Sequence, residues 1–562
     1  MSKHCSRTAI ALLLTGTVLG VPLVAAAQLS PSTVDPGQLQ RRLKEPRSWH
    51  PATTITIPGT EDEGLKSASE EKVFTLGSVA LDGSTVYSAE DFAEQYSDFV
   101  GKAVSFADLR RIASRMTNKY RADGYILSRV IVPPQKVGSG AVHFKAIEGR
   151  IESVEFEGDI KGDKELLDAY AAKIVASKPI NASKLERYML LIDDLPGVTA
   201  RSVIRPSRKT SQAATLVITL DHKMIEGDVS VDNRGNRFLG PEQLGAVLAI
   251  NSGMGMYDRN TFRGIASADF DELFYGEFTH ESQLGTEGTR LNVRAATTYT
   301  NPGGRLEPLD IEGSSHLFEA SVMYPYLRSR EENLDFYGGF RIQNTQTDIL
   351  STNLFEDRVR VASAGFQYDN TDNLDGVNQL DASLSQGIDG LGATHDGAGR
   401  SRVSGEHSFT RFNATLTRIQ NIDDEFSFYL SADGQYTSDS LLTSEQFAIG
   451  GSRFGRAYDG SEITGDNGLA GLVELRYAGF PSGGWFESYQ PYVFYDIGKV
   501  WTNVPAVGEQ NHESLASTGL GVRFNLINDF SGEAQLAVPL THQVASERDE
   551  DARFFFNLLK RF

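Results

Sequence analysis

Cysteine, long apolar runs and excess basic charge are all missing from this sequence. Its 562 residues include one cysteine, Cys5, which excludes a disulfide within the chain and a metal site built on cysteine. Asp and Glu total 74 against 54 Lys and Arg, so the formal net charge is −20. Because binding to a polyanion needs a basic surface, we expect no nucleic-acid partner.

The usual signatures of catalysis are missing too. The 10 histidines are scattered and form no H-E-x-x-H or H-x-x-E-H pair, and the chain has no G-x-S-x-G elbow. Residues 71–222 hold neither a Gly-rich phosphate loop nor an evident catalytic cluster of carboxylates. We therefore expect no catalytic residues, no metal site and no cofactor, and hence no enzyme.

Residues 1–27 predict a secretory signal peptide. Lys3 and Arg7 precede a mostly apolar stretch at 8–24, and Ala25-Ala26-Ala27 then offers a cleavage site. The alternative is a membrane anchor, but the apolar stretch is short and is interrupted by glycine and proline. No later run reaches 18 apolar residues, so two fates remain, namely soluble export or a β-barrel in an outer membrane.

Residues 28–70 are polar and irregular, and they contain one helix candidate at 36–45. Asp35 is placed to cap this helix, and Pro36 suits its first position. The alternative is a frayed segment of a linker, because the stretch that follows is interrupted by prolines.

Residues 71–222 predict two small α/β units of similar layout, at 71–149 and 150–222. Each reads as β-α-α-β-β, and a helix at 106–120 has its apolar residues at i, i+3, i+4 and i+7. The expected strands and remaining helices are 73–81, 88–99, 125–132 and 141–147 in the first unit, and 151–156, 165–175, 183–191, 203–204 and 215–220 in the second.

From 223 to 562 the helical period gives way to alternation of polar and apolar residues. Segments of roughly ten residues suit a barrel wall with one face toward lipid and one toward water. We expect sixteen strands, which start near 224, 243, 258, 273, 289, 316, 332, 357, 376, 405, 426, 469, 489, 513, 530 and 552.

The connections and the last strand favour a membrane barrel over the alternative of a soluble β-sandwich or β-solenoid. Connections after even-numbered strands are mostly tight, whereas many after odd-numbered strands are long, such as 302–315, 390–404 and 439–468. The final segment carries Phe554, Phe556, Leu558 and Phe562 on one face. Such a strand would promote aggregation in water, but it suits a lipid-facing strand that closes the barrel.

A candidate pair of functional residues lies in the barrel region. In FYDIG (494–498), Phe494, Asp496 and Gly498 share one strand face, so Asp496 points into the lumen if the other face meets lipid. Gly498 leaves room for another backbone to approach. Arg456 lies in the longest loop and could hold that loop inside the pore by a charge-assisted bond to Asp496. The alternative is that both residues are ordinary solvated charges.

The signal peptide, the two α/β units and the sixteen-stranded barrel together resemble the two-partner secretion transporters, the TpsB or ShlB/FhaC/HecB family of the BamA-like superfamily. The loop IGGSRFGRAYDGSEITGDNG (449–468) is similar to the family's loop-six signature, and FYDIG is similar to its F-x-D-x-G pattern. In relatives an Arg-Gly-Tyr/Phe tip folds back into the barrel. Here the tip is Arg456-Ala457-Tyr458, so alanine replaces the usual glycine, and alanine resists a positive φ.

The resemblance covers nearly the whole chain and implies a function. Residues 71–149 and 150–222 would be periplasmic POTRA domains, 223–562 a transmembrane barrel in the outer membrane of a Gram-negative bacterium, and the helix at 36–45 a pore plug. The partners would be a secreted exoprotein of the TpsA type, outer-membrane lipid, and the barrel assembly machinery for insertion. Two other functions stay open, namely a BamA-like assembly factor and a passive porin or nutrient receptor.

Overall fold

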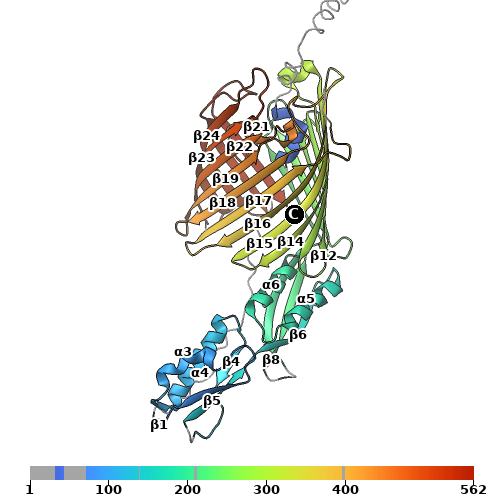
Figure 1. Ribbon diagram of the computed structural model, residues 1–562. Helices are drawn as coiled ribbons and strands as arrows, with labels where there is room; N and C mark the ends of the chain where they lie inside the picture. Colours follow the sequence, from blue (N-terminus) through green and yellow to red (C-terminus); the bar gives the residue numbers. More distant parts are fainter. Residues whose placement is uncertain are drawn as a thin grey trace, which may run out of the picture.

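The computed structural model describes residues 32–43, 71–137, 140–207, 210, 212–394, 399–481 and 483–562. The expected signal peptide, and the expected linker as far as residue 70, lie outside these residues. The described chain forms a barrel with two α/β units stacked below it, and Figure 1 shows the second unit next to the barrel and the first farther away. No helix among the described residues is long and apolar enough to cross a membrane.

The barrel is a closed ring of sixteen antiparallel strands, which confirms the expected fold class. Each strand starts within five residues of the start expected from alternation. The strands are β9 (Ile225–Asp232), β10 (Gln243–Asn251), β11 (Arg259–Ser267), β12 (Leu273–Leu284), β13 (Thr289–Thr300), β14 (Ile311–Arg328), β15 (Glu332–Ile349), β16 (Thr352–Thr371), β17 (Gly376–Gly387), β18 (Thr410–Asn421), β19 (Phe426–Thr437), β22 (Asn467–Tyr477), β23 (Phe486–Trp501), β24 (His512–Leu526), β25 (Phe530–Pro539) and β26 (Arg553–Arg561).

Three neighbouring strands are much longer than the expected ten residues. β14 and β15 have 18 residues each and β16 has 20, and they pair along nearly their whole length. Crossing a membrane takes about 9–11 residues of a tilted strand, so this side of the wall extends beyond the others. β16 pairs with β17 only from Val361 onward, so the surplus of β16 lies at the long-loop end. β14, in contrast, extends past its pairing with β13 mainly at the other end, after Met323.

The two ends of the barrel differ as expected. The end next to the α/β units carries tight turns (Figure 1). The last residue lies near this end, because Phe562 exchanges backbone hydrogen bonds with Gly227 near the start of β9. The other end carries the long loops, which include loop one (233–242), loop five (388–409), loop six (438–466), loop seven (502–511) and loop eight (540–552). The connection expected at 302–315 is shorter, because β14 already begins at Ile311.

The first α/β unit differs from expectation in its short elements. The strand expected at 73–81 is divided into β1 (Lys72–Thr75), which pairs with β3 (Ala103–Ser105), and β2 (Ser78–Asp82), which pairs with β5 (Ala141–Ile147). The helix expected at 88–99 is one turn of α-helix, α3 (Ala93–Tyr96), between the 3-10 turns η4 (Glu90–Phe92) and η5 (Ser97–Phe99). Its Phe, Tyr, Ser and Asp are weak helix formers, which explains the interruption.

The core of the first unit is as expected. Helix α4 (Phe106–Ala122) starts at a capping box made by Ser105 and Asp108, and it buries its apolar face. The face consists of Leu109, Ile112, Ala113 and Met116. It packs on a sheet in which β5 lies between β2 and the short strand β4 (Arg129–Ile131).

The second unit repeats this arrangement. β8 (Ala213–His222) lies between β6 (Arg150–Gly158), which is parallel to it, and β7 (Val198–Pro206), which is antiparallel. Helices α5 (Lys164–Ala176) and α6 (Ala182–Asp193) pack on this sheet. β9 of the barrel follows β8 after two residues, so the unit is joined directly to the wall.

The second unit is also held to the barrel by side chains from the tight turns. Tyr257, in the turn between β10 and β11, is 1% exposed and belongs to the unit's hydrophobic core. Its ring lies against Gly162, where a Cβ atom would be 2.5 Å away. Arg328 binds Asp194, the C-cap of α6, through two hydrogen bonds, of 2.7 and 2.8 Å, and Lys173 forms an ion pair with Glu287. These contacts fix the unit at the mouth of the barrel.

We expect Tyr257→Ala to loosen the second unit from the barrel. The change removes a large buried side chain, which typically costs about 3–5 kcal/mol. Hydrogen exchange of α5 and α6, together with limited proteolysis at 223–225, measures the effect. Met256→Ala is the matched control, since Met256 is the neighbouring side chain and is exposed. Equal protection of α5 and α6 in both variants would contradict the anchoring role of Tyr257.

Candidate functional site

The lumen at the long-loop end is occupied by helix α2 (Pro36–Arg42) and by loop six. In Figure 1, α2 is the short blue helix inside the barrel near β21. Loop six contains the 3-10 turn η7 (Thr443–Glu445), then β20 (Phe447–Ile449) and β21 (Ile463–Gly465), which pair with each other. We call residues 438–449 and 463–466 the base of loop six and residues 450–462 its tip.

Apolar packing holds loop six inside the lumen. The tip inserts Phe454, Ala457 and Tyr458 among lumen-facing side chains of the wall, and the base adds Phe447, Ile449 and Ile463. Fully burying one such side chain contributes about 1.5–3 kcal/mol, so the folded-in loop has a substantial core of its own. Loop six is therefore an ordered element of the lumen.

Arg456 and Asp496, which the sequence suggests as a pair, lie in direct contact. Arg456 donates three hydrogen bonds to the Asp496 carboxylate, from its backbone N–H at 3.0 Å, from Nε at 3.1 Å and from Nη2 at 3.0 Å. Ser517 Oγ donates a further bond to the same carboxylate, at 3.2 Å. The bidentate geometry fixes both the position and the orientation of the loop-six tip.

The Arg456 side chain is almost entirely buried, at 4% exposure, and Asp496 is fully buried. The guanidinium carbon of Arg456 lies 3.6 Å from the ring centre of Phe494. Phe494, which the sequence places on the same strand face as Asp496, therefore packs against the ion pair. Removing one partner of a buried ion pair costs about 3–5 kcal/mol, because the other charge stays buried. The ordinary solvated charges considered as the alternative do not fit this geometry.

Tyr458 ties the tip to loop eight. Its hydroxyl lies 2.8 Å from Thr541 Oγ1 and 3.3 Å from the carbonyl oxygen of Ala516. Its ring is 2% exposed and lies against His542, with centroids 4.9 Å apart. The tip therefore contacts the wall through Arg456 on one side and through Tyr458 on the other.

Two glycine-related expectations turn out differently. Ala457, in place of the family's glycine, is not among the residues with positive φ, so the alanine fits its backbone conformation. The positive φ, +74°, belongs instead to Gly455, just before the arginine. At Gly498 we expected another backbone to approach. The structure places the Ile449 side chain there, 2.5 Å from the position that a Cβ atom would take.

Glu474 is a third charged residue of this site, and the sequence reasoning missed it. Its Oε2 accepts a 2.7 Å hydrogen bond from Arg456 Nη1, and it also pairs with Arg476 and Arg523. The signal was available in principle, because alternation along β22 puts Glu474 on the lumen face and the register sets it opposite Phe494. Without the register of β22 with β23, however, nothing in the sequence distinguishes Glu474 from the other acidic residues that face the lumen.

Helix α2 is shorter than the expected 36–45 and ends at Arg42. Asp35 caps its start by accepting a hydrogen bond from Gln38 N–H at 2.8 Å, as expected, and Pro36 occupies the first position. At its end, Arg263 of β11 donates a 2.6 Å bond to the carbonyl oxygen of Leu43. Both ends of the helix are thus satisfied by specific partners.

The seat of α2 is mostly polar. Gln40 exchanges hydrogen bonds with Ser315 and accepts one from Gln343, both in the wall. Gln38 and Arg41 donate to backbone carbonyls of 443–446 in the base of loop six. Leu39, in contrast, is buried in a small apolar cluster.

Helix α2 and the turn before it also contact the tip of loop six. Ser32 Oγ donates a 2.7 Å hydrogen bond to the carbonyl oxygen of Ser461. The Arg42 guanidinium lies so close to Gly460 that a Cβ atom there would be 1.4 Å from Nη1. Lys44, the third basic residue of the expected helix, lies outside the described residues.

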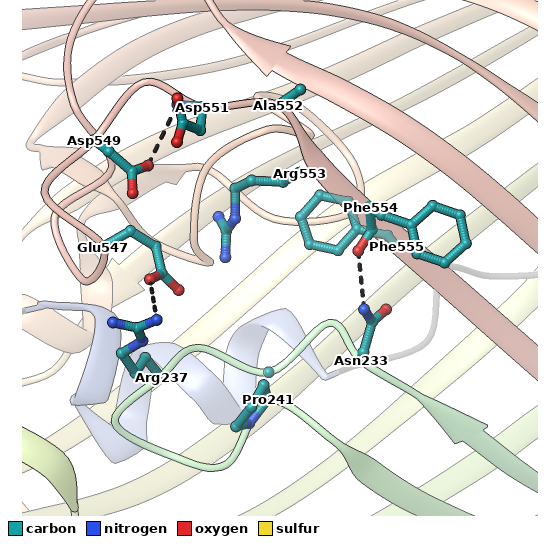
Figure 2. A pocket seen from close by; sticks show the side chains of 11 residues that line it. Asn233, Arg237, Pro241, Glu547, Asp549, Asp551, Ala552, Arg553, Phe554 and Phe555 are labelled. Atoms are coloured by element: carbon teal, nitrogen blue, oxygen red, sulfur yellow. Dashed lines mark hydrogen bonds and ion pairs between the residues drawn. The ribbon is translucent and has the colours of Figure 1, made fainter.

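The aromatic residues expected to close the barrel are on its last strand. Phe554 and Phe562 are exposed on the outer face at 58% and 56%, and Phe556 shares that face. β26 pairs with β9 over five residue pairs, from Asn557↔Asp232 to Arg561↔Asp228, and so completes the ring. Beyond this ladder, the Asn233 side chain bonds to the backbone of Phe554 and Phe556 (Figure 2).

Family models match both parts of the chain. A model described as haemolysin secretion/activation protein ShlB/FhaC/HecB matches residues 215–524. A second, described as POTRA domain, ShlB-type, matches residues 74–149. The second α/β unit shares the strand arrangement of the matched unit but lies largely outside both matches.

Relatives and solved structures agree with the family models. The chain is 24% identical to the heme/hemopexin transporter protein HuxB of Haemophilus influenzae (strain 86-028NP), over 97% of both chains. It is 23% identical to the outer membrane transporter CdiB of Escherichia coli, over 85% of this chain and 82% of that one. The solved structure of CdiB from Escherichia coli superimposes with a TM-score of 0.73 at 19% identity and covers 98% of this chain and 97% of its own.

BamA from Haemophilus ducreyi, lacking its first three POTRA domains, is less similar. Its TM-score is 0.50 at 12% identity, covering 87% of this chain and all of that one. The protein described here thus belongs to the ShlB/FhaC/HecB family of haemolysin secretion/activation proteins, the outer-membrane transporters of two-partner secretion.

Proposed function

We propose that this barrel secretes an unfolded exoprotein of the TpsA type from the periplasm through its own lumen. The two α/β units capture the exoprotein, and it enters the lumen once α2 and the tip of loop six have left their seats. The second unit suits capture, because its sheet ends in the edge strands β6 and β7 beside the barrel mouth. An extended segment adds to such an edge by main-chain hydrogen bonds.

The main support for this proposal is that α2, which fills part of the lumen, is held much less firmly than the strands of the wall. Wall strands are hydrogen-bonded to both neighbours and cannot leave. In contrast, α2 and its C-cap Leu43 are bonded to the wall by a few hydrogen bonds, each of which involves the side chain of Gln40 or of Arg263. α2 has seven residues, and isolated helices shorter than about 12–15 residues are marginal in water, so it depends on its seat. A polar helix held by a few hydrogen bonds is a removable plug.

Charge supports the same reading. Arg42 is attracted by Asp459 and Asp232. Arg41 is attracted by Glu445 and Asp433 but repelled by Arg411 and Arg341. The attraction of Arg42 to its two carboxylates acts without close packing. An exoprotein that displaces α2 therefore opens the small apolar cluster around Leu39, whereas displacing the tip of loop six opens the larger cluster around Phe454 and Tyr458.

The outer face fits the expected membrane partners. Exposed Phe and Leu side chains face outward from strands around the barrel, such as Phe262 of β11, Phe318 of β14, Phe412 of β18 and Leu469 of β22. A lipid bilayer is the partner that such a surface requires. As an outer-membrane barrel, the chain would be inserted by the barrel assembly machinery.

The alternative of a BamA-like assembly factor has less support. HuxB and CdiB, which are similar to most of the chain, are described as transporters, and CdiB superimposes better than BamA. A passive porin has no use for two periplasmic α/β units fixed to the barrel mouth. Secretion of an exoprotein explains the units, the plug and the folded-in loop together.

We expect Arg456→Ala and Asp496→Ala each to reduce secretion about tenfold or more, since either change leaves a buried charge unpaired. The double variant should be little worse than Arg456→Ala, because both residues hold one tip. The assay measures exoprotein in the medium at matched transporter levels, with the large secreted protein that we expect in the neighbouring reading frame.

Arg453→Ala is the matched control for this pair. Arg453 lies three residues from Arg456 in the same tip, but its side chain is 56% exposed and pairs with Asp433 at 3.3 Å. An exposed ion pair contributes only about 0–1 kcal/mol, so secretion should stay near that of the parent. Fully additive losses in the double variant, or normal secretion by either single, would show that this pair does not hold the tip.

A disulfide between α2 and loop six tests whether the helix must leave. A Cβ atom at Gly37 would be 2.8 Å from Ser444 Cβ, within about an ångström of the ~3.8 Å typical of disulfides. We expect Gly37→Cys/Ser444→Cys to stop secretion when oxidised and to recover with reductant. Each single cysteine variant is the control. Secretion that continues with the disulfide intact would mean that α2 can remain in place.

A further inference from the structure

The base of loop six holds a buried carboxylate between two strands of the wall, β15 and β18. Glu445, in η7, is fully buried and forms ion pairs with Arg341 of β15 and Arg411 of β18. Arg411 also donates to the Glu445 carbonyl oxygen, at 2.9 Å. Burial raises the pKa of Glu445, but Arg341, Arg411 and Arg41 outweigh it and lower the pKa to about 2, so the carboxylate is ionised at neutral pH.

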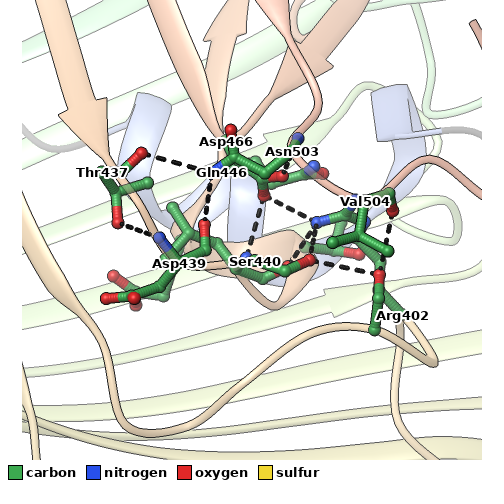
Figure 3. Close-up of polar contacts among 12 residues, drawn as sticks. Arg402, Thr437, Asp439, Ser440, Gln446, Asp466, Asn503 and Val504 are labelled. Carbon is green, nitrogen blue, oxygen red and sulfur yellow. Dashed lines mark hydrogen bonds and ion pairs between the residues drawn. The ribbon is translucent and has the colours of Figure 1, made fainter. Parts of the chain in front are cut away.

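A second buried carboxylate holds the other arm of the base. Asp466, also fully buried, accepts a 2.7 Å hydrogen bond from Arg402 of loop five and a 2.8 Å bond from the backbone N–H of Asn503 in loop seven. It accepts a third, of 2.9 Å, from Leu441 N–H in the first arm of loop six. Figure 3 shows Arg402, Ser440 and Asn503 gathered around Asp466.

The tip is joined to this base by residues whose backbone φ is positive. Gly450 and Gly451 have φ of +119° and +94°, conformations that glycine adopts without strain. On the returning side, Ser461 also has a positive φ, of +60°. The base itself is packed on the wall, where Gly465 of β21 lies against Val500 and Trp501 of β23.

We propose that the base of loop six is a stationary seat for the plug helix, fixed by Glu445 and Asp466, and that only the tip swings during secretion, about Gly450–Gly451 and Ser461. Glu445 and Asp466 are positioning residues in this account, because Gln38 and Arg41 of α2 bind the backbone carbonyls on either side of Glu445. The proposal rests on secretion through the lumen and adds which part of the loop moves.

A disulfide between base and wall tests this directly. A Cβ atom at Gly465 would be 2.9 Å from Val500 Cβ, so a cysteine pair there forms a bond after a small shift. The chain's one cysteine, Cys5, lies in the expected signal peptide, so no other thiol competes. We expect oxidised Gly465→Cys/Val500→Cys to secrete within about twofold of the same variant under reductant. Secretion that stops on oxidation and returns with reductant would overturn the stationary base.

A second measurement does not depend on disulfide geometry. We expect Asp466→Asn to raise the resting conductance of the barrel in planar bilayers severalfold, because a loosened base no longer seats α2. Adding the Gly465–Val500 disulfide to this variant should return the conductance to that of the parent. If Asp466→Asn instead caused a general folding defect, the disulfide would not restore the conductance. Unchanged conductance in Asp466→Asn would overturn the role of Asp466.

Failure of this proposal can be told apart from failure of the proposed function. If a disulfide between Gly37 and Ser444 stops secretion and one between Gly465 and Val500 also does, the lumen is the route but the base moves. If neither disulfide affects secretion, the exoprotein does not pass the plug, and secretion through the lumen itself is contradicted.

Discussion

The contact of Arg456 with Asp496 and Glu474 holds the tip of loop six inside the lumen. A guanidinium buried inside a barrel needs full pairing, and two wall carboxylates on adjacent strands supply it. Once the arginine is in place, the tip of loop six lies across the lumen, Tyr458 reaches loop eight, and Ser461 meets the start of the plug segment through Ser32. The position of loop six in the lumen thus depends on where the buried charge of Arg456 finds its two carboxylates.

The wall imposes the complementary constraint. Every strand is bonded to two neighbours, so the barrel cannot open by removing a strand without losing a ladder of hydrogen bonds. Closure and opening therefore fall to elements that are not part of the wall. Helix α2 and loop six are such elements, and both are held by side chains: Gln40 and Arg41 for the helix, Arg456 for the tip, and Glu445 and Asp466 for the base.

Alternation along the chain predicted the barrel well, because each strand must present one face to lipid and one to water, and this pattern appears in the sequence of every strand. Arg456 and Asp496 could be paired from a strand face and a resemblance. Glu474, Glu445 and Asp466 could not, since their importance depends on which segments the barrel brings together across the lumen. The splitting of 73–81 into β1 and β2, and the extra length of β14–β16, likewise depend on pairing partners far along the chain.

Site-specific photo-crosslinking tests most directly whether the exoprotein passes through the lumen. Ser383 and Leu384 are neighbours on β17, and Leu384 faces outward at 54% exposure, so Ser383 faces the lumen by strand alternation. A photoreactive residue at 383 should crosslink to an exoprotein stalled during secretion, whereas one at 384 should crosslink to lipid alone. Crosslinks to the exoprotein from 384, or none from 383, would contradict secretion through the barrel lumen.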